Sequence, residues 1–171
     1  MIQGPRPGPG RHLFPHARLK PVHSGTINLE RIRSLASALE SRLPESNFRV
    51  GNLADLPFND GHFHFVICSA VLHFAHDDRH FEAMVGEMWR VLAPGGVFFA
   101  RLASTIGIED RVTAGKNRWH TLPDGTDRFL VDEAYVLRIT SDLGGQLLDP
   151  LKTTNVQNLR AMTTWVVGKS R

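Results

Sequence analysis

Three histidines that lie close together in the sequence are the side chains best suited to chemistry in this chain. His73, His76 and His80 fall within eight residues, and the last two are one helical turn apart. Histidine titrates near neutral pH, so His73 could orient a substrate or act as a general base, or it could pack in a loop without chemical work. A metal site is disfavoured, because the three histidines have no cysteine among them and no clear fourth ligand.

The first of these histidines follows a stretch that reads as a buried strand. Residues 63–71 carry almost no polar side chain after His64, which is typical of a parallel strand covered on both faces. Ser69, Ala70 and His73 come at the carboxyl end of this stretch. Open α/β sheets bind small ligands outside the carboxyl ends of their strands, so the sequence predicts a site here.

The elements that position this site alternate between strands and helices, as in an α/β protein. Strands are expected at residues 21–28, 48–50 and 97–100, in addition to 63–71, and a helix is expected at 29–43. Asn28 has the side chain of a helix cap for that helix. This order of elements predicts an open sheet with helices packed against it.

A second helix is expected to begin at Asp77 or Asp78 and to end at Pro94-Gly95-Gly96, because proline cannot continue a helix and glycine accepts a positive φ. Its apolar residues are spaced to form one buried stripe, and they are Phe81, Met84, Val85, Met88 and Leu92. The charged residues are expected to face outward, and they are Arg79, Glu82, Glu87 and Arg90.

The last third of the chain differs in composition from the part before it. Residues 105–128 are rich in glycine and charge and are expected to form a loop or lid, since connections of this length are more often functional than short ones. A helix is expected from Asp132 to Leu143, ended by Gly144-Gly145, with inward positions Ala134 and Leu137 and a further candidate at Val136. Strands at 147–155 and 160–168 are expected to form an antiparallel hairpin.

Composition places limits on the class of protein. The 171 residues predict one domain, 1–171, and the net charge of +3 comes from scattered rather than clustered Lys and Arg, which gives no support to nucleic-acid binding. The first 20 residues are Gly/Pro-rich and are expected to be irregular, without a signal peptide. No apolar run has the length of a membrane span. Cys68 is expected to be a buried apolar thiol rather than a reactive one, and the cytoplasm is the expected location.

Four segments in a fixed order give the chain a family resemblance: Gly51 to Phe58, Phe63 to Ile67, Ser69 to Phe74, and Glu87 to Gly96. They resemble class I S-adenosylmethionine-dependent methyltransferases of the small-molecule, type 11-like kind, strongly over residues 48–104 and moderately over 129–168. The resemblance implies a Rossmann-like, doubly wound, mostly parallel sheet that ends in an antiparallel hairpin. It also implies transfer of a methyl group from S-adenosylmethionine to a small-molecule acceptor.

The resemblance assigns roles to residues at two strand ends. Asn52 and Leu53 match the positions that lie along the adenine, and Asp55 is a nearby carboxylate that could replace the aspartate more usual at the Asn52 position. The alternative is that Asn52 and Asp55 satisfy the backbone of a turn, as these residue types often do. Ser69 and Ala70 match the positions beside the methionine half of the cofactor, and His73 is the candidate catalytic residue.

The N-terminal segment fits the family less well. Gly8 and Gly10 resemble the second half of the family's glycine-rich loop, but Arg6 occupies the first glycine position. Asn28 stands near the place of the acidic residue that binds the ribose hydroxyls. The central strand that should precede the loop is missing, so a truncated start is expected. The alternative is that the Gly/Pro cluster is a disordered tail.

The acceptor is expected to enter under residues 105–128, near Arg101, Trp119 and His120. The expected partners are a small-molecule acceptor but no nucleic acid or membrane, and the chain is expected to be a monomer or a homodimer. The alternative function is that of a non-catalytic, methyltransferase-like binding or regulatory domain that has lost full cofactor binding.

Overall fold

The computed structural model describes residues 2–3, 16–21 and 48–171, with side chains from residue 51 onward. The predictions for Gly8, Gly10 and Asn28, and the helix expected at 29–43, lie outside the described residues. The main sheet contains β1 (Ile2–Gln3), β2 (His16–Pro21), β3 (Phe48–Gly51), β4 (Phe63–Ser69), β5 (Leu92–Ser104), β9 (Gly145–Leu147), β10 (Lys152–Val156) and β11 (Arg160–Lys169).

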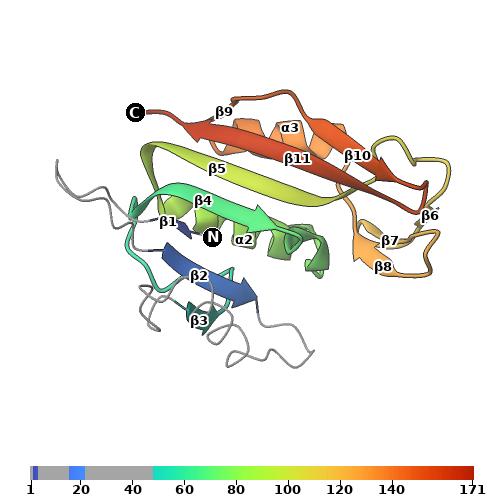
Figure 1. Cartoon of the computed structure of the whole chain (residues 1–171), viewed down its shortest axis with the longest axis horizontal. Coiled ribbons are helices and arrows are strands. Elements are labelled where there is room, and N and C mark those ends of the chain that lie inside the picture. Colours follow the sequence, from blue (N-terminus) through green and yellow to red (C-terminus); the bar gives the residue numbers. More distant parts are fainter. Residues whose placement is uncertain (1, 4–15, 22–47) are drawn as a thin grey trace.

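The main sheet has the strand order β10-β11-β5-β4-β1-β2-β3, and β9 pairs with β11 (Figure 1). The pairs β4–β5 and β2–β3 are parallel, whereas β1 pairs antiparallel with both β2 and β4. The C-terminal strands β10 and β11 form the predicted antiparallel hairpin, and β11 also pairs antiparallel with β5. The described sheet is therefore mixed, with its central parallel pair at β4 and β5.

Two short strands lie where irregular structure was expected. The first 20 residues contain β1 and most of β2, which ends at Pro21. The rest of the strand expected at 21–28 lies outside the described residues. The backbone of β1 pairs with β4 through Ile2 and Val66, in the position next to β4. An open strand edge offers hydrogen-bonding partners to any backbone that reaches it. The local composition of a segment does not show whether it will reach such an edge.

The first described α-helix, α2 (Asp78–Arg90), begins where the sequence predicted. The Asp77 carboxylate accepts a hydrogen bond from the His80 N–H at 2.7 Å and caps the helix. The predicted stripe of Phe81, Met84, Val85 and Met88 is buried.

The end of α2 comes earlier than predicted. The helix stops at Arg90 rather than at Pro94-Gly95-Gly96, because the next residues already pair with the β4 region: the Phe63 N–H donates to the Val91 carbonyl at 2.9 Å. The Pro-Gly-Gly segment lies within β5, where the register with β4 shifts. Gly95 has a φ of +74°, as expected for one of the two glycines.

The second helix, α3 (Glu133–Asp142), is capped by Asp132, whose carboxylate accepts from the Tyr135 N–H at 2.7 Å. Its inward face differs from the prediction. Ala134 and Leu137 are exposed, and only Val136 of the three predicted positions is buried. The buried stripe is made instead by Tyr135, Val136, Ile139 and Thr140.

The inward face of α3 was mispredicted because it contains polar atoms that the core satisfies. The Trp165 indole N–H donates to the Thr140 hydroxyl at 3.0 Å, and that hydroxyl donates to the Val136 carbonyl at 2.8 Å. With its polar groups paired, Thr140 can be buried at little cost.

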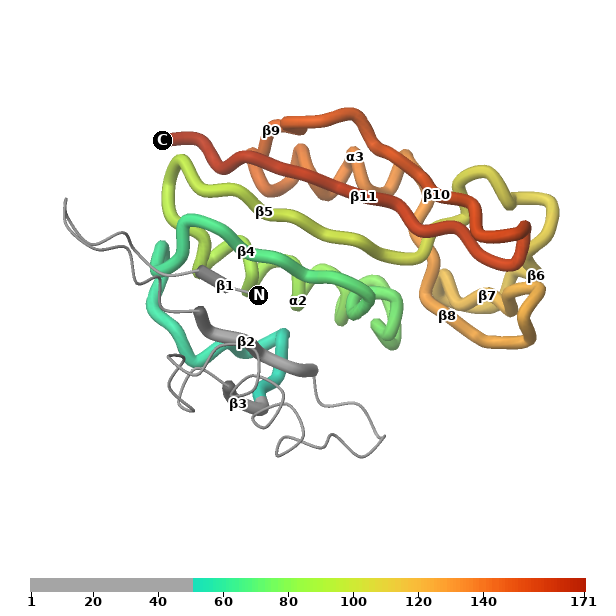
Figure 2. Tube along the Cα trace, viewed as in Figure 1, coloured from blue at the N-terminus to red at the C-terminus, as the bar shows by residue number. Residues whose placement is uncertain are grey.

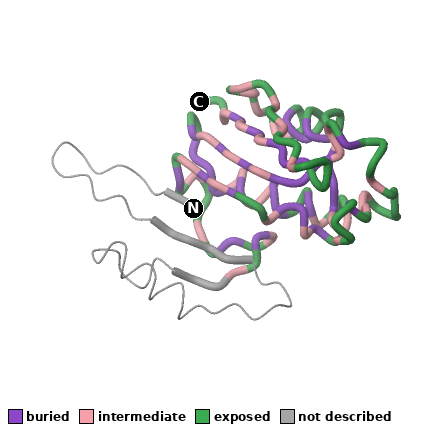
Figure 3. The backbone as a smooth tube through the Cα atoms, turned by 45° about the vertical axis from the view of Figure 1, so that its right-hand side comes forward, coloured by how far each residue is buried: buried purple, intermediate pink, exposed green. Residues whose placement is uncertain are grey.

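The core lies between the sheet and the two helices (Figure 3). Buried and half-buried side chains alternate along β5, and Phe98, Ala100 and Leu102 belong to the core that includes α2 and α3. On β4 the core positions are Phe63, Val66 and Cys68, whereas Phe65 and Ile67 on the other face are half-buried. Burial of β4 is thus one-sided rather than two-sided, as far as the structure describes its surroundings.

Residues 105–128 contain strands in place of a plain loop. β6 (Thr113–Ala114), β7 (Trp119–Thr121) and β8 (Asp127–Phe129) form a small antiparallel sheet. This small sheet lies beyond the ends to which β4 and β5 point, next to the β10–β11 turn (Figure 2). It therefore stands over the edge of the main sheet where the sequence predicted a site.

Candidate functional site

A cavity of about 250 Å³ lies at the carboxyl ends of β4 and β5. Ala70 and His73, which follow β4, line one part of it, and Arg101 of β5 lines another. The small sheet and the start of β11 close the remaining sides, with Leu122, Asp124, Thr126 and Arg128 from the former and Arg160 and Met162 from the latter. The structure thus brings together Ala70, His73 and Arg101, which the sequence had singled out.

The backbone turns sharply where β4 ends. Ala70 has a φ of +58°, a left-handed conformation that is costly for a residue with a Cβ. Its N–H donates to the Arg101 carbonyl at 2.8 Å, which ties this turn to β5. Ser69 and Ala70 are both exposed, so small side chains lie at the solvent-facing carboxyl end of β4. Strain of this kind is concentrated at functional sites, where the surrounding structure maintains it.

His73 is held in a short 3-10 turn, η2 (Leu72–Phe74). Its side chain is 7% exposed and lines the cavity, and its ring centroid lies 4.5 Å from that of Phe74. Burial on a short turn beside an aromatic ring restricts the rotamers of the imidazole. The predicted histidine therefore lies at the cavity wall in a fixed position.

The loop after β3 is an exposed turn. The Asn52 carboxamide oxygen accepts from the Ala54 N–H at 3.0 Å, and the Asp55 N–H donates to the Asn52 carbonyl at 3.2 Å. Asn52 thus satisfies turn backbone, the alternative that the sequence left open. Asp55 is exposed, whereas the Leu53 side chain is buried in the core, so only the backbone of Leu53 is available to a ligand.

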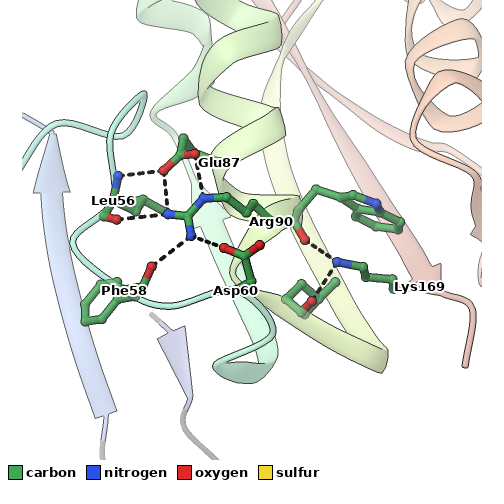
Figure 4. A network of polar contacts seen from close by, with 8 residues as sticks. Leu56, Phe58, Asp60, Glu87, Arg90 and Lys169 are labelled. Atoms are coloured by element: carbon green, nitrogen blue, oxygen red, sulfur yellow. Dashed lines mark hydrogen bonds and ion pairs between the residues drawn. The ribbon is translucent and has the colours of Figure 1, made fainter.

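The residues after this turn are fixed by a group of polar contacts that we call the loop clamp: Glu87 and Arg90 of α2 with residues 56–60 (Figure 4). Arg90 donates five hydrogen bonds: to both Glu87 carboxylate oxygens, to the Leu56 and Phe58 carbonyls and to Asp60, at 2.6–3.0 Å. Glu87 in turn accepts from the Leu56 N–H at 2.8 Å. Both side chains were predicted to face solvent. They instead form hydrogen bonds with the backbone of residues 56–58.

The loop clamp has a clear electrostatic signature. The hydrogen bond from Arg90 is the main cause that lowers the pKa of the Glu87 carboxyl. Burial opposes it in part, and the hydrogen bond from the Leu56 N–H adds a smaller lowering. The hydrogen bonds that Arg90 donates to the Glu87 and Asp60 carboxylates raise the pKa of its guanidinium. Nearby, the Lys169 ammonium donates to the Trp89 and Leu92 carbonyls at 2.7 and 2.8 Å, which fixes the end of α2 (Figure 4).

Trp119 and His120 lie in the small sheet but do not line the cavity. The Trp119 indole N–H donates to the His76 carbonyl at 2.7 Å, and the His120 Nδ1 lies 2.8 Å from the Arg118 carbonyl oxygen. Arg118 pairs with Asp132 at 2.7 Å and lies over the Tyr135 ring at 3.9 Å. These residues attach the small sheet to the starts of α2 and α3.

The other chemically active side chains are occupied by structural contacts. The His80 Nδ1 accepts from the His76 N–H at 3.1 Å, and the two rings stack at 4.5 Å, while His73 lies apart from them in the cavity wall. Within the described residues no group of three metal-ligating side chains occurs. Burial raises the pKa of the Cys68 thiol to about 12, so this cysteine is an unreactive core residue.

Comparison with known families tests the resemblance inferred from the sequence. Residues 7–100, more than half of the chain, match the model of the methyltransferase domain family. The chain belongs to this methyltransferase family. A relative from Mycolicibacterium smegmatis, named as an S-adenosylmethionine-dependent methyltransferase, is 32% identical over 95 residues. That match covers 56% of this chain and 36% of the relative, so the chain spans well under half of that protein's length.

Solved structures confirm the Rossmann-like α/β fold class of this methyltransferase domain. An S-adenosylmethionine-dependent methyltransferase from Methanosarcina mazei has 18% identity and a TM-score of 0.61, covering 72% of this chain and 66% of its own. A Burkholderia thailandensis 1,6-didemethyltoxoflavin-N1-methyltransferase, solved with bound 1,6-didemethyltoxoflavin and S-adenosylhomocysteine, has 12% identity and a TM-score of 0.56, covering 79% of this chain and 56% of its own. At these identities the likeness concerns the fold alone.

The sequence missed most residues on the far side of the cavity of this methyltransferase domain. Arg128 and Arg160 line it together with Arg101, although neither stands in a motif. The sequence could not have shown that these arginines lie together, because they come from three separate strands whose arrangement depends on the hairpin and the small sheet. No helix among the described residues combines the length and hydropathy that a membrane crossing requires.

Proposed function

We propose that this chain forms the cofactor-binding part of an S-adenosylmethionine-dependent methyltransferase that acts on a small molecule. The observation that carries the proposal is the cavity at the carboxyl ends of β4 and β5, which adjoins exposed small residues on a strained turn. Family membership supports the cofactor, S-adenosylmethionine. The size of the cavity and its position under the small sheet support a small acceptor.

The described residues that we assign to this cofactor lie at two strand ends. Ser69 and Ala70 would lie beside its methionine half, since both are small residues exposed at the turn that follows β4. Asn52, the Leu53 backbone and Asp55 would lie along its adenine. When bound, S-adenosylmethionine supplies an electrophilic methyl group.

The chain's own residues would orient the acceptor and handle its proton. His73 lies in the cavity wall, where its imidazole could hold the acceptor or accept a proton from it as the acceptor becomes nucleophilic. The small sheet would exclude water from the cavity, and its attachment through Trp119 and Arg118 keeps it in place. Catalysis of this kind depends on positioning more than on a covalent nucleophile.

Calorimetric titration with S-adenosylhomocysteine tests the proposal. We expect binding to the wild-type chain, and binding reduced at least about tenfold in Ser69→Leu, which would place a branched side chain in the cofactor's path. Ser141→Leu, an exposed serine at the end of α3, is the matched control and should bind like the wild type. Absence of heat and of any thermal shift at millimolar ligand would overturn the proposal.

A further inference from the structure

The charges that line the cavity are unbalanced. Arg101 of β5, Arg128 of β8 and Arg160 of β11 all contribute to its wall, and Asp124 is the one carboxylate among the lining residues. His73 is the remaining titratable group there. Even with Asp124 ionised, the cavity keeps a net positive charge.

Asp124 offsets the charge of the arginines only in part, through space and without a salt bridge to any arginine that the structure describes. Its Oδ1 accepts from both the N–H and the hydroxyl of Thr126, at 3.0 and 2.5 Å, and its side chain is exposed. The Thr126 hydroxyl is the main cause that lowers the pKa of Asp124, and Arg160 and Arg128 add to it through their charge, so the carboxylate is ionised at neutral pH. No salt bridge joins it to an arginine within the described residues.

The guanidinium groups keep most of their donors for a ligand. Arg128 is positioned by one hydrogen bond to the Asp127 carbonyl at 2.6 Å and lies 5.0 Å from the Phe74 ring centroid. In the part of the chain that the structure describes, the side chains of Arg101 and Arg160 form neither an ion pair nor a hydrogen bond, although Arg101 is half-buried. Each guanidinium has five N–H donors in a planar fork that matches carboxylate and phosphate oxygens.

We propose that the acceptor of the proposed methyltransferase is a small oxyanion, a carboxylate or a phosphate monoester, held by Arg101, Arg128 and Arg160. This inference rests on the proposed function, because it assumes that the cavity is the acceptor site. Three arginines on different strands can surround an anionic group from several sides. The volume of about 250 Å³ limits the acceptor, or its acidic end, to about the size of a substituted ring.

The test uses benzoate, phenyl phosphate and the uncharged benzamide as probes, titrated into the full chain at constant ionic strength. We expect benzoate or phenyl phosphate to bind, and benzamide to bind at least about tenfold more weakly. Tighter binding of phenyl phosphate identifies a phosphate site, and tighter binding of benzoate identifies a carboxylate site. Equal binding of benzamide and the two anions would overturn the inference.

Variants locate the anion site. Arg101→Gln and Arg160→Gln should each weaken the preferred anion about tenfold, whereas Arg79→Gln on the exposed side of α2 should leave its affinity unchanged. Arg101→Lys keeps the charge but loses the planar fork, so we expect an intermediate loss. Arg160 is exposed, so its variant should fold even if Arg101→Gln does not. Wild-type anion affinity in a folded Arg160→Gln variant would contradict the assignment.

Titration with S-adenosylhomocysteine separates this inference from the proposed function. If S-adenosylhomocysteine binds and neither anion does, the acceptor inference fails while the proposed function stands. If an anion binds but S-adenosylhomocysteine does not, the proposed function fails, and with it the acceptor role of the anion site. If S-adenosylhomocysteine displaces the bound anion competitively, the arginines belong to the cofactor site, which also overturns the inference.

Discussion

Arg90 and Arg101 lie near opposite ends of β5, and their guanidinium groups have different surroundings. Arg90 donates five hydrogen bonds within the loop clamp, to Glu87, Asp60 and two backbone carbonyls. Arg101 lines the cavity and forms no hydrogen bond or ion pair through its side chain within the described residues. Both arginines are half-buried, so burial class alone does not distinguish them.

The difference separates an arginine that holds the fold together from arginines that line the cavity. A guanidinium whose five donors are all used stabilises the fold and has nothing left for a ligand. A half-buried guanidinium beside other cations loses some solvation without gaining a partner, and a bound anion would supply one. Substitutions near the loop clamp, at the start of β5, should therefore mainly lower stability (the clamp end). Substitutions near the cavity, at the carboxyl ends of β4 and β5, should mainly weaken binding (the cavity end).

The largest expected effect is at the irregular Pro94-Gly95-Gly96 segment within β5, at the end of the strand near the loop clamp. A Cβ at Gly96 would lie 2.7 Å from the Ala93 carbonyl oxygen, so we expect Gly96→Val to lower the free energy of unfolding by about 3 kcal/mol. Gly95→Val should cost more than about 1 kcal/mol, because Gly95 has a positive φ that β-branched residues avoid.

Urea denaturation of these glycine variants gives the measurement. Gly86→Ala on α2 is the control and should be neutral or stabilising, since a Cβ there would meet nothing within 4 Å. An unchanged midpoint for both valine variants would show that the backbone relaxes in this segment.

The next largest effect is the removal of Arg90. We expect Arg90→Ala to lower the free energy of unfolding by about 2 kcal/mol, because the Glu87 carboxylate and two loop carbonyls lose their donor. Arg160→Ala at the cavity end is the matched control, and it should change stability by less than about 0.5 kcal/mol. Equal losses in the two variants would remove the contrast between the two ends.

A smaller effect is expected at the strained turn of the cavity end. Ala70→Gly should raise the free energy of unfolding by up to about 1 kcal/mol, because glycine adopts the φ of +58° without the Cβ penalty. Ala114→Gly, in β6, should lower it by about 0.5 kcal/mol, since that position has no such strain. Thermal melting of both variants checks the pair, and a destabilised Ala70→Gly would refute the strain at this turn.

The smallest effect concerns the pH dependence of the loop clamp. Folding lowers the pKa of Glu87 below its ordinary value of 4.5, so the charged carboxylate stabilises the fold above that value, and its contribution is lost as the pH falls toward the lowered folded pKa. The stability advantage of wild type over Glu87→Gln should therefore shrink between about pH 5 and pH 3. Parallel stability profiles of the two proteins would contradict this assignment.

Much of the local structure could be predicted from the sequence. The starts of α2 and α3 follow from the capping residues Asp77 and Asp132, and the buried stripe of α2 follows from its spacing. The end of α2 could not be placed, because pairing of Phe63 with Val91 competes with the last helical turn. The buried face of α3 could not be assigned either, because Thr140 depends on a partner from β11.

The candidate site divides in the same way. Residues that follow a strand directly, such as Ala70 and His73, were predictable because the end of a parallel strand is visible in the sequence. Trp119 and His120 were chosen for their chemistry, but the fold uses Trp119 to attach the small sheet to His76. Arg128 gave no signal, since its position over the cavity depends on the pairing of β7 with β8.

The sequence by itself determined the methyltransferase family, the α/β class and the strand end at which the cavity lies, because these depend on short-range patterns of apolar, capping and turn residues. Only the tertiary structure decided which arginine holds a loop and which ones line a cavity. Arg90 lies close in sequence to Glu87 but its other partners are 30–34 residues away, and Arg101 and Arg160 line one cavity because β11 pairs with β5. A guanidinium takes its role from the oxygens that long-range pairing brings within reach, and no local pattern records them.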